Sequence, residues 1–524
     1  MKKTRVITPV VGTLLFLSGC GANGQSVADD NSNNTPVVEL NFTQDKELSG
    51  FLSVSTFDSM MTGPFVEEAA KLFMDKHPEV EIEVSSFSAP PNIVSAGGGV
   101  MVSQSMDNMA EKIDYINGIN TELMSGRGAD IIAMEILPFY NYAQNGQLVN
   151  LEAYMNADPS FDKSNYRAEI LDAIRLDDGL YMFPLDYSFN YVTYDSSVFT
   201  DGLGISSDKL TYDQLIDLGA AYTSAENTYV LPLFAGPVPG LFAEMFNVDY
   251  DYYADILGRN ANFTGGRFES LIEQVMNYEK EGYIRTRDDN MGPMPMLSME
   301  ERQEMLMADH FLFDRRSSAQ LLGEFYETTG MGMRVASMTA ESQYDEIAGL
   351  IANEDGEVTF SLGSAFGINE NSQEKELAWE FIKFLADEAM GESMRVRGLP
   401  TNISVFEERT KMSIAGVGFA PMMMPGMAGA GPIKQDGPGE GKMPMPEPVE
   451  KPEFIELDAT QQQAYDAYIA QVETFTKMLN KYTITDTMVE DIIRTEVKEV
   501  FDGNKSASDA ANVIQNRVGL FLNE

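Results

Sequence analysis

The stretch of sequence that decides the fold reads FLSVS at residues 51–55, TGPFVEEAAKLFMDKHP at 62–78 and VEIEV at 80–84. The first and third segments alternate apolar with polar residues, which is typical of β-strands with one buried face. In the second segment the apolar residues share one face of a helix, namely Phe65, Val66, Ala69, Leu72 and Phe73. Strand, helix and strand within about 35 residues predict a βαβ unit, and therefore a parallel sheet with a right-handed crossover.

The same theme recurs along the chain. ADIIAM at 129–134 is a short apolar run that follows the helical pattern of residues 113–124, and it predicts a buried parallel strand. A further helix is expected from about residue 372, and the helical spacing of apolar residues from residue 465 onward predicts helices to the end of the sequence. A chain of 524 residues, 44% of them hydrophobic, has material for more than one domain. We therefore expect an α/β protein with helices flanking its sheets.

The charge balance excludes several classes of function. Lys and Arg number 36 and Asp and Glu number 81, so the formal net charge is −45. A surface this acidic repels phosphate backbones and anionic lipid heads, so no nucleic-acid partner is expected. With a single cysteine the chain cannot form an internal disulfide, and with two histidines it offers little material for histidine chemistry.

The amino terminus has the pattern of a secretory signal. A basic start at residues 2–5 precedes the apolar run Val6–Leu17, which is too short to span a bilayer. LSGC at 17–20 resembles the lipobox of bacterial lipoproteins, in which the cysteine sulfur receives a diacylglyceryl group. Two acyl chains suffice for stable anchoring. The alternative is an ordinary signal peptide with a cysteine there by chance.

These features predict how the first residues are used. We expect a signal peptide at 1–19, a lipid on Cys20 and a flexible, lipidated tether at 20–45, with the protein on the outer face of the cell membrane. No later stretch reaches about 18 consecutive apolar residues, so no other segment is expected to cross the membrane.

Residues 412–452 are crowded with Met, Pro and Gly and cannot hold a regular element. Methionine thioethers bind Cu(I), so a copper site is one interpretation. The other is an extended surface loop or an adaptable apolar flap, because no His or Cys accompanies the methionines.

Several stretches together resemble a known family. They are FVEEAAKLFMDKHPEVEIEV at 65–84; GADII at 128–132 with NGQLVNL at 145–151; DGLYMFP at 178–184 with YVTYD at 191–195 and LTYDQL at 210–215; and AWEFIKFL at 378–385 with GLPTN at 398–402. Their order and spacing are similar to those of the extracellular solute-binding proteins of ABC importers, of the maltodextrin-binding type. The likeness spans most of residues 48–524.

The resemblance implies two α/β lobes with a hinge and a cleft between them, of the type II-like periplasmic-binding-protein fold. The implied boundaries are 46–187 with 365–402 for lobe 1, 188–364 with 403–524 for lobe 2, and crossings near 184–194, 362–368 and 399–404. It also implies a small solute, most simply an oligosaccharide, and permease subunits with a separate ATPase, since the chain has no P-loop of its own. A monomer without cofactor is expected.

Candidate solute-binding residues follow from the chemistry of sugar sites, which need aromatic faces together with short polar groups. The candidates are Asp186, Tyr187 and Asn190 in the hinge stretch, Phe234 and Gly236 after a short apolar strand, Glu135 after the strand at 129–134, Phe57 and Asp58 after the first strand, and Asp314 from the second lobe. Each also has a plainer interpretation as an ordinary strand, turn or surface-pair residue. Residues 247–255, rich in Asp and Tyr, suit a cleft edge, a calcium loop or a solvated helix face.

An enzyme is not expected, and neither catalytic nor metal-binding residues are predicted. His77 and His310 have no nucleophile motif beside them, and no cluster of His and Cys suggests zinc. Two alternatives stay open, namely an extracellular lipoprotein glycosidase, which needs only two carboxylates, and a surface sensor with a binding-protein fold.

Overall fold

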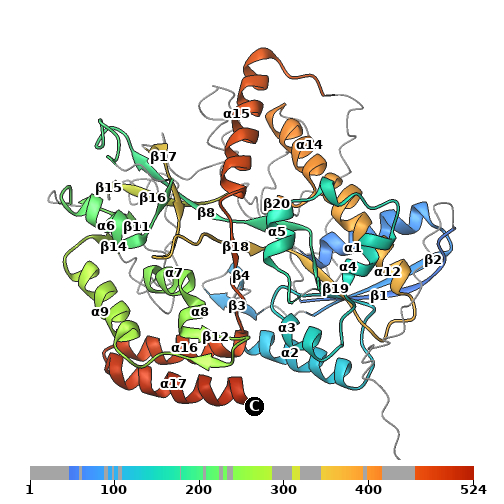
Figure 1. The fold of residues 1–524 in the computed structure, drawn as a ribbon, viewed down its shortest axis with the longest axis horizontal. Helices are drawn as coiled ribbons and strands as arrows, with labels where there is room; N and C mark the ends of the chain where they lie inside the picture. The colour runs from blue at the N-terminus through green and yellow to red at the C-terminus, as the bar shows by residue number, and fades with distance from the viewer. Residues whose placement is uncertain are drawn as a thin grey trace, which may run out of the picture. The chain divides into compact units, whose positions relative to one another are not determined.

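The structure is a computed structural model (Figure 1). It describes residues 47–57, 62–87, 92–96, 99–103, 109–177, 179–204, 208–223, 228–232, 240–285, 310–318, 344–393, 398–415 and 455–524. The chain divides into two units, residues 1–41 and 42–524, and all that follows concerns the second. The predicted signal peptide, Cys20, the whole predicted tether and most of the Met-rich segment lie outside the described residues.

The first sheet has five strands in the order β2-β1-β5-β19-β6. They are β1 (Gly50–Thr56), β2 (Val80–Ser86), β5 (Ile131–Ala133), β19 (Ala365–Ile368) and β6 (Phe183–Pro184). β1 is parallel to both β2 and β5, whereas β19 is antiparallel to β5 and β6. The predicted βαβ unit and the predicted parallel pairing are confirmed.

Helices lie on both sides of this sheet in Figure 1, with α1, α4 and α12 on one side and α2 and α3 on the other. Their bounds are α1 Thr62–Lys76, α2 Met109–Met124, α3 Phe139–Gln144, α4 Leu151–Ala157, a short η1 Lys163–Asn165, α5 Ala168–Ala173, α12 Lys375–Phe384, the π-helical turn η2 Leu385–Ala389 and α13 Met390–Glu392. Trp379 of α12 is fully buried, and its indole N–H donates to Asp158 Oδ2 at 3.0 Å.

The second sheet has four strands in the order β16-β8-β17-β9. They are β8 (Asn190–Asp195), β9 (Lys209–Leu210), β16 (Phe313–Ser317) and β17 (Tyr344–Ile351). β8 is antiparallel to both of its neighbours, and β9 pairs in parallel with β17. Around it are α6 Tyr212–Ala220, α7 Gly240–Val248, α8 Tyr250–Tyr253, α9 Arg267–Lys280 and the short pairs β10 Thr228–Tyr229 with β15 His310–Phe311, β11 Leu231–Pro232 with β14 Ile284–Arg285, and β12 Ala254–Asp255 with β13 Asn260–Ala261.

A third sheet, β20-β7-β18-β21, joins the first two, and we name it the hinge sheet. It consists of β7 (Asp186–Ser188), β18 (Thr359–Leu362), β20 (Leu399–Pro400) and β21 (Lys481–Tyr482). The chain leaves the first sheet at β6 and passes through β7 to β8 in the second, and it returns from β17 through β18 to β19. The crossings expected from the resemblance fall on these strands, while the exact domain boundaries stay a prediction.

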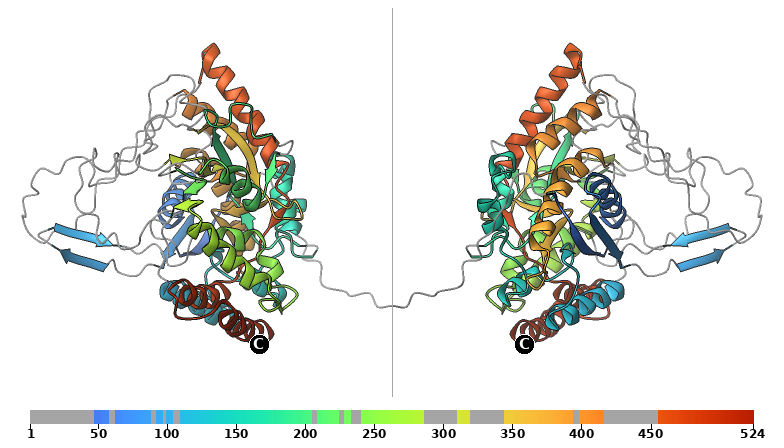
Figure 2. Two further views of the ribbon diagram at one scale, coloured as in Figure 1. Left: turned by 90° about the vertical axis from the view of Figure 1, so that its left-hand side faces the viewer. Right: turned by 90° about the vertical axis from the view of Figure 1, so that its right-hand side faces the viewer.

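The remaining elements are α14 Ile403–Ile414, α15 Ala459–Thr476, α16 Thr487–Phe501, α17 Ala507–Asn523 and the antiparallel pair β3 Asn92–Ala96 with β4 Gly99–Ser103. α17 packs against α9, β13 and α16, and α16 contacts α2 at the end of the molecule seen at the bottom of both views in Figure 2. Sequence signals explain where these helices begin, because the Asp458, Asp486 and Ser506 side chains accept hydrogen bonds from the first-turn N–H groups. Among the described residues, no helix is both long and apolar enough to serve as a membrane span.

The packing of α12 generates a testable expectation. Phe381 is fully buried, with the ring of Phe73 centred 5.2 Å away. We expect Phe381→Ala to lower the free energy of unfolding by about 3–5 kcal/mol, because it removes a large apolar side chain and leaves a cavity. Urea titration followed by the fluorescence of Trp379 measures the change. Phe51→Ala is the control, since this ring on β1 is 45% exposed; its loss should cost about 1 kcal/mol or less. Equal losses for the two variants would contradict the packing.

Candidate functional site

Two phenylalanines follow neighbouring parallel strands at the same edge of the first sheet. Thr56, the last residue of β1, is paired with Ser86, the last residue of β2. Phe57 and Phe87 are the residues that directly follow the two strands. The Phe87 N–H donates to the Thr56 carbonyl at 2.7 Å, and the two rings stack with centroids 6.2 Å apart. In open α/β sheets, ligands bind beyond the carboxyl ends of the strands, which is where these rings lie.

Tyr115 of α2 completes an aromatic cluster with Phe57 and Phe87. Its ring centroid is 5.4 Å from that of Phe57 and 5.5 Å from that of Phe87. The Tyr115 hydroxyl lies 3.2 Å from Ser55 Oγ of β1. Burial raises the pKa of Tyr115 well above its ordinary value, so the hydroxyl is neutral at physiological pH.

A carboxylate is held beside this cluster. Glu135 follows β5, the parallel neighbour of β1 on the other side from β2, and its Oε1 accepts a hydrogen bond of 2.6 Å from Thr62 Oγ1 at the start of α1. The charge of Glu135 also contributes to the raised pKa of Tyr115, because the two groups are close. The edge of the sheet therefore offers apolar ring faces and a carboxylate together. This combination suits the apolar face and the hydroxyl groups of a sugar.

The hinge candidates Asp186 and Tyr187 have partners inside the protein. Asp186 is 2% exposed, and its two carboxylate oxygens accept N–H bonds from Ser364 at 2.7 Å and Gly398 at 2.8 Å. Tyr187 is fully buried, with its hydroxyl 2.7 Å from Thr476 Oγ1 of α15. These bonds give both residues a structural role, and contact with a solute stays a prediction for them.

The other candidates are scattered or outside the described residues. Asn190 begins β8 and is exposed, with its backbone paired to Ser317. Asp314 lies in β16, and its backbone pairs with Thr193 of β8. Asp58, Phe234 and Gly236 lie outside the described residues. Of the sequence candidates within the described residues, Phe57 and Glu135 are the two that lie at the same sheet edge.

His310, one of the two histidines, is paired with a carboxylate. His310 Nε2 lies 2.9 Å from Asp195 Oδ2, and Asp195 also accepts a bond from Ser197 N. The Ser197 hydroxyl donates to the same carboxylate at 2.5 Å, on Oδ1, and the His310–Asp195 contact joins β15 to β8. Within the described ranges, no three His, Cys, Asp or Glu side chains gather as a metal site requires.

Comparison with known proteins agrees with this architecture. The sequence model of the bacterial extracellular solute-binding proteins matches residues 105–408, which is more than half of the chain. The chain belongs to this family. No curated protein matches the sequence closely enough to count as a relative.

Solved structures of solute-binding proteins share the fold. An extracellular solute-binding protein of family 1 from Alicyclobacillus acidocaldarius is 15% identical, with a TM-score of 0.52, and the match covers 92% of this chain and all of that one. The sugar-binding protein MalE from Xanthomonas citri is 14% identical, with a TM-score of 0.53 and coverage of 90% and 98%. An ABC substrate-binding protein from Listeria monocytogenes, solved in complex with cycloalternan, is 13% identical, with a TM-score of 0.50 and coverage of 91% and 99%. The two-lobed fold expected for this solute-binding protein is thus confirmed.

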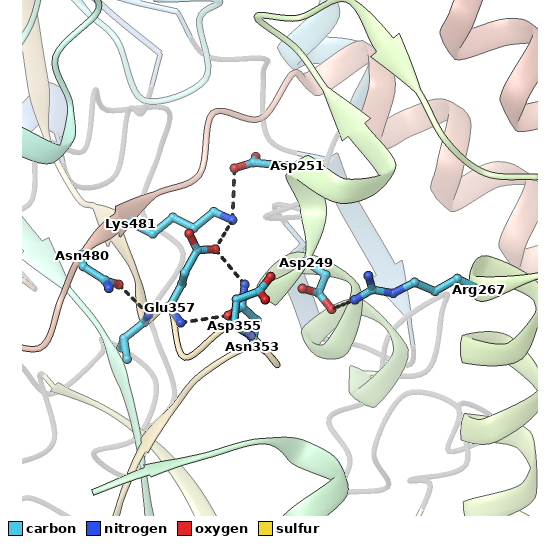
Figure 3. Close-up of polar contacts among 9 residues, drawn as sticks. Asp249, Asp251, Arg267, Asn353, Asp355, Glu357, Asn480 and Lys481 are labelled. Carbon is cyan, nitrogen blue, oxygen red and sulfur yellow. Dashed lines mark hydrogen bonds and ion pairs between the residues drawn. The ribbon is translucent and has the colours of Figure 1, made fainter.

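A lysine anchors the acidic region that the sequence suggested as a cleft edge or calcium loop (Figure 3). Lys481 of β21 lies 2.8 Å from Glu357 and 3.3 Å from Asp251 of α8. The Lys481 ammonium holds the pKa of Glu357 below its ordinary value, and Asn353 adds a second hydrogen bond. Asp249 is paired with Arg267 at 2.6 Å. These carboxylates neutralise basic side chains, which gives no support to a calcium loop.

The structure also has a cavity of about 350 Å³, and none of the residues Phe57, Phe87, Tyr115, Thr62 and Glu135 lines it. It lies among α2, α3, the segment at 485–488 and the end of α17. Within its lining, the hydroxyl of Tyr140 in α3 donates to Asp486 at 2.6 Å. We place the candidate site at the sheet edge because the chemistry converges there.

Sequence reasoning missed two members of the aromatic cluster. Phe87 follows β2 just as Phe57 follows β1, so the same argument would have found it. Tyr115 gives no such signal, because it belongs to a helix and its neighbours at the edge come from residues about 30 to 60 positions away. Thr62 belongs to the site because its hydroxyl, at the start of α1, donates to the carboxylate of Glu135, which follows β5.

The buried Asp186 predicts a pH dependence of stability. Burial raises the pKa of Asp186 to about 6 from 3.8, although the N–H bonds from Ser364 and Gly398 oppose this rise. Between these two pH values the folded chain holds a proton that the unfolded chain has released. The contribution of this carboxyl to stability is therefore complete below pH 3.8 and is lost as the pH rises through 6.

Asp186→Asn cannot titrate. As the pH rises from about 4 to about 7, we therefore expect its free energy of unfolding to increase relative to that of the parent by up to about 3 kcal/mol. Urea unfolding of both proteins across this range, followed by circular dichroism, gives the difference directly. The many other carboxylates affect parent and variant alike, so they cancel. A difference that does not change with pH would contradict a buried, titrating carboxyl.

Proposed function

We propose that this solute-binding protein is held to the outer face of the cell membrane by a lipid on Cys20. It captures an oligosaccharide between its two lobes and delivers the sugar to an ABC importer. It works with permease subunits and with a separate ATPase, which supplies the energy of import because this sequence has no P-loop.

The observation that carries the sugar proposal is the aromatic cluster with Glu135 at the carboxyl edge of the first sheet. Phe87 is 37% exposed, so one ring is open to a ligand while Tyr115 behind it is buried. Bonds within the protein hold the polar partners in place, from Thr62 to Glu135 and between Ser55 and Tyr115. A rigid face of this kind binds a sugar ring with little loss of conformational entropy.

Two further observations support the proposal. Among the structures that share the fold, one holds cycloalternan and another is a sugar-binding protein. The net charge of −45 disfavours anionic solutes, whereas neutral sugars approach without repulsion.

The aromatic cluster can be tested by one substitution. We expect Phe87→Ala to weaken sugar binding about tenfold, because the ring face loses its contact with the sugar. Thermal shift with maltotriose, cellotriose and a cyclic tetrasaccharide identifies a ligand of the parent, and calorimetric titration then measures the loss.

Phe51→Ala is the matched control, since it removes an exposed phenylalanine from the same sheet at the opposite end of β1. It should bind sugar as the parent does. Equal affinity of Phe87→Ala and the parent would contradict a sugar site at this edge. Release of reducing ends from any sugar in the panel would favour the alternative of a glycosidase.

The lipid anchor is tested by Cys20→Ala in the organism or in a bacterial host with lipoprotein processing. We expect the parent in the membrane fraction, labelled by a palmitate analogue, and the variant unlabelled and released to the medium or periplasm, because it lacks acyl chains. A variant that remains with the membrane would point to another means of attachment.

A further inference from the structure

The carboxylate of Asp186, in the first of the three crossings, binds the backbone of the other two. Ser364 N donates to Asp186 Oδ1 at 2.7 Å, and Gly398 N donates to Oδ2 at 2.8 Å. Gly363 N adds a bond of 3.2 Å to the backbone carbonyl of Asp186. A residue of the first crossing thus holds the second and the third, which are 178 and 212 positions further along the chain.

The geometry leaves no space for side chains at the two points of approach. A Cβ atom on Gly363 or on Gly398 would lie 2.3 Å from Asp186 Oδ2. Real Cβ atoms do not come this close to an oxygen, so glycine at both positions is what allows the backbone of each crossing to reach the carboxylate.

The Asp186 carboxylate is buried, and its hydrogen-bond partners are groups of the protein itself. The side chain is 2% exposed, and both of its oxygens accept backbone bonds. Among the described residues, the charged group that acts on it is Arg409 of α14, which also donates to the carbonyls of Met390 and Ser393. Thr401 Oγ1, just after β20, donates to the Pro184 carbonyl at 2.7 Å and ties the third crossing to the first a second time.

We propose that Asp186 is the positioning residue of the hinge. By binding the second and third crossings at once, its carboxylate makes the three crossings turn as one unit, and it thereby sets the affinity for the solute without touching it. This inference rests on the proposed closure of two lobes around a sugar.

The link to affinity follows from the equilibrium between open and closed forms. Closure of a hinged protein requires backbone rotations in every crossing segment. When the segments are joined, few hinge conformations are available, and the closed form competes with a narrow open ensemble. When they are released, the open ensemble broadens and the fraction competent to hold the solute falls.

The test uses the whole chain with Cys20→Ser, which removes the natural cysteine. Lys71→Cys on α1 and Lys280→Cys on α9 then carry spin labels on opposite sides of the hinge sheet (Figure 1). Pulsed electron resonance without sugar measures the distribution of distances between them in the parent, Asp186→Asn, Gly398→Ala and Asp158→Asn. Gly398→Ala displaces the carboxylate from the other side without changing its chemistry. Asp158→Asn is the control, because Asp158 is also buried but binds Trp379 and Lys383 away from the hinge.

We expect a broader distribution for Asp186→Asn and Gly398→Ala and an unchanged one for Asp158→Asn. With the sugar found in the thermal-shift panel as probe, the dissociation constant of the two hinge variants should rise about tenfold, as for the loss of one hydrogen bond to a charged group. Calorimetric titration gives the dissociation constants.

Three results would overturn the inference. The first is an unchanged distance distribution in both hinge variants. The second is an equal broadening in Asp158→Asn, which would indicate general loosening. The third is weaker binding without any change in distances, which would indicate that Asp186 touches the sugar itself. If no sugar binds the parent, the proposed function fails while the distance measurement still decides the role of the hinge. If Asp186→Asn does not fold, Gly398→Ala decides it.

Discussion

The structure depends on a carboxylate buried where the two main sheets are joined. An ionised group taken out of water is costly, and the compensation here comes from backbone N–H groups of two distant segments. That compensation is available only if β7, the turn after β18 and the start of β20 meet at Asp186. The bonds therefore specify how the first sheet, the hinge sheet and the second sheet follow one another along the chain.

The candidate site depends on this arrangement in a simple way. Phe57, Phe87 and Glu135 belong to the first sheet, whose β19 and β6 lead directly into the hinge strands. A solute held at this edge contacts a rigid wall, because Tyr115 and Thr62 are bonded to the strand ends. The moving part is then the hinge and not the wall. This division suits a binding protein, in which recognition needs fixed groups and release needs motion.

Sequence patterns predicted the parts of the fold that depend on local order. The alternation in residues 51–55 and 80–84 and the helical face between them specified β1, α1 and β2, because burial of one face leaves its period in the sequence. The positions directly after strands gave Phe57 and Glu135. The role of Asp186 could not be read in this way, because its partners are backbone N–H groups far along the chain and carry no side-chain signal. The same limit hid Tyr115, whose place in the site depends on how α2 packs.

The positions of the few basic residues help to explain how so acidic a chain folds. With 36 Lys and Arg against 81 Asp and Glu, most carboxylates have no cation to pair with, and they remain hydrated. Two cations at largely buried positions join segments distant in sequence: Lys481 joins β21 to α8 and to the turn before β18, and Lys383 joins α12 to Asp158. Each such pair neutralises charge where solvent is excluded and repulsion would be strongest. The uncompensated charge is thereby left at the surface, where it keeps anionic molecules away and leaves neutral polar ones free to approach.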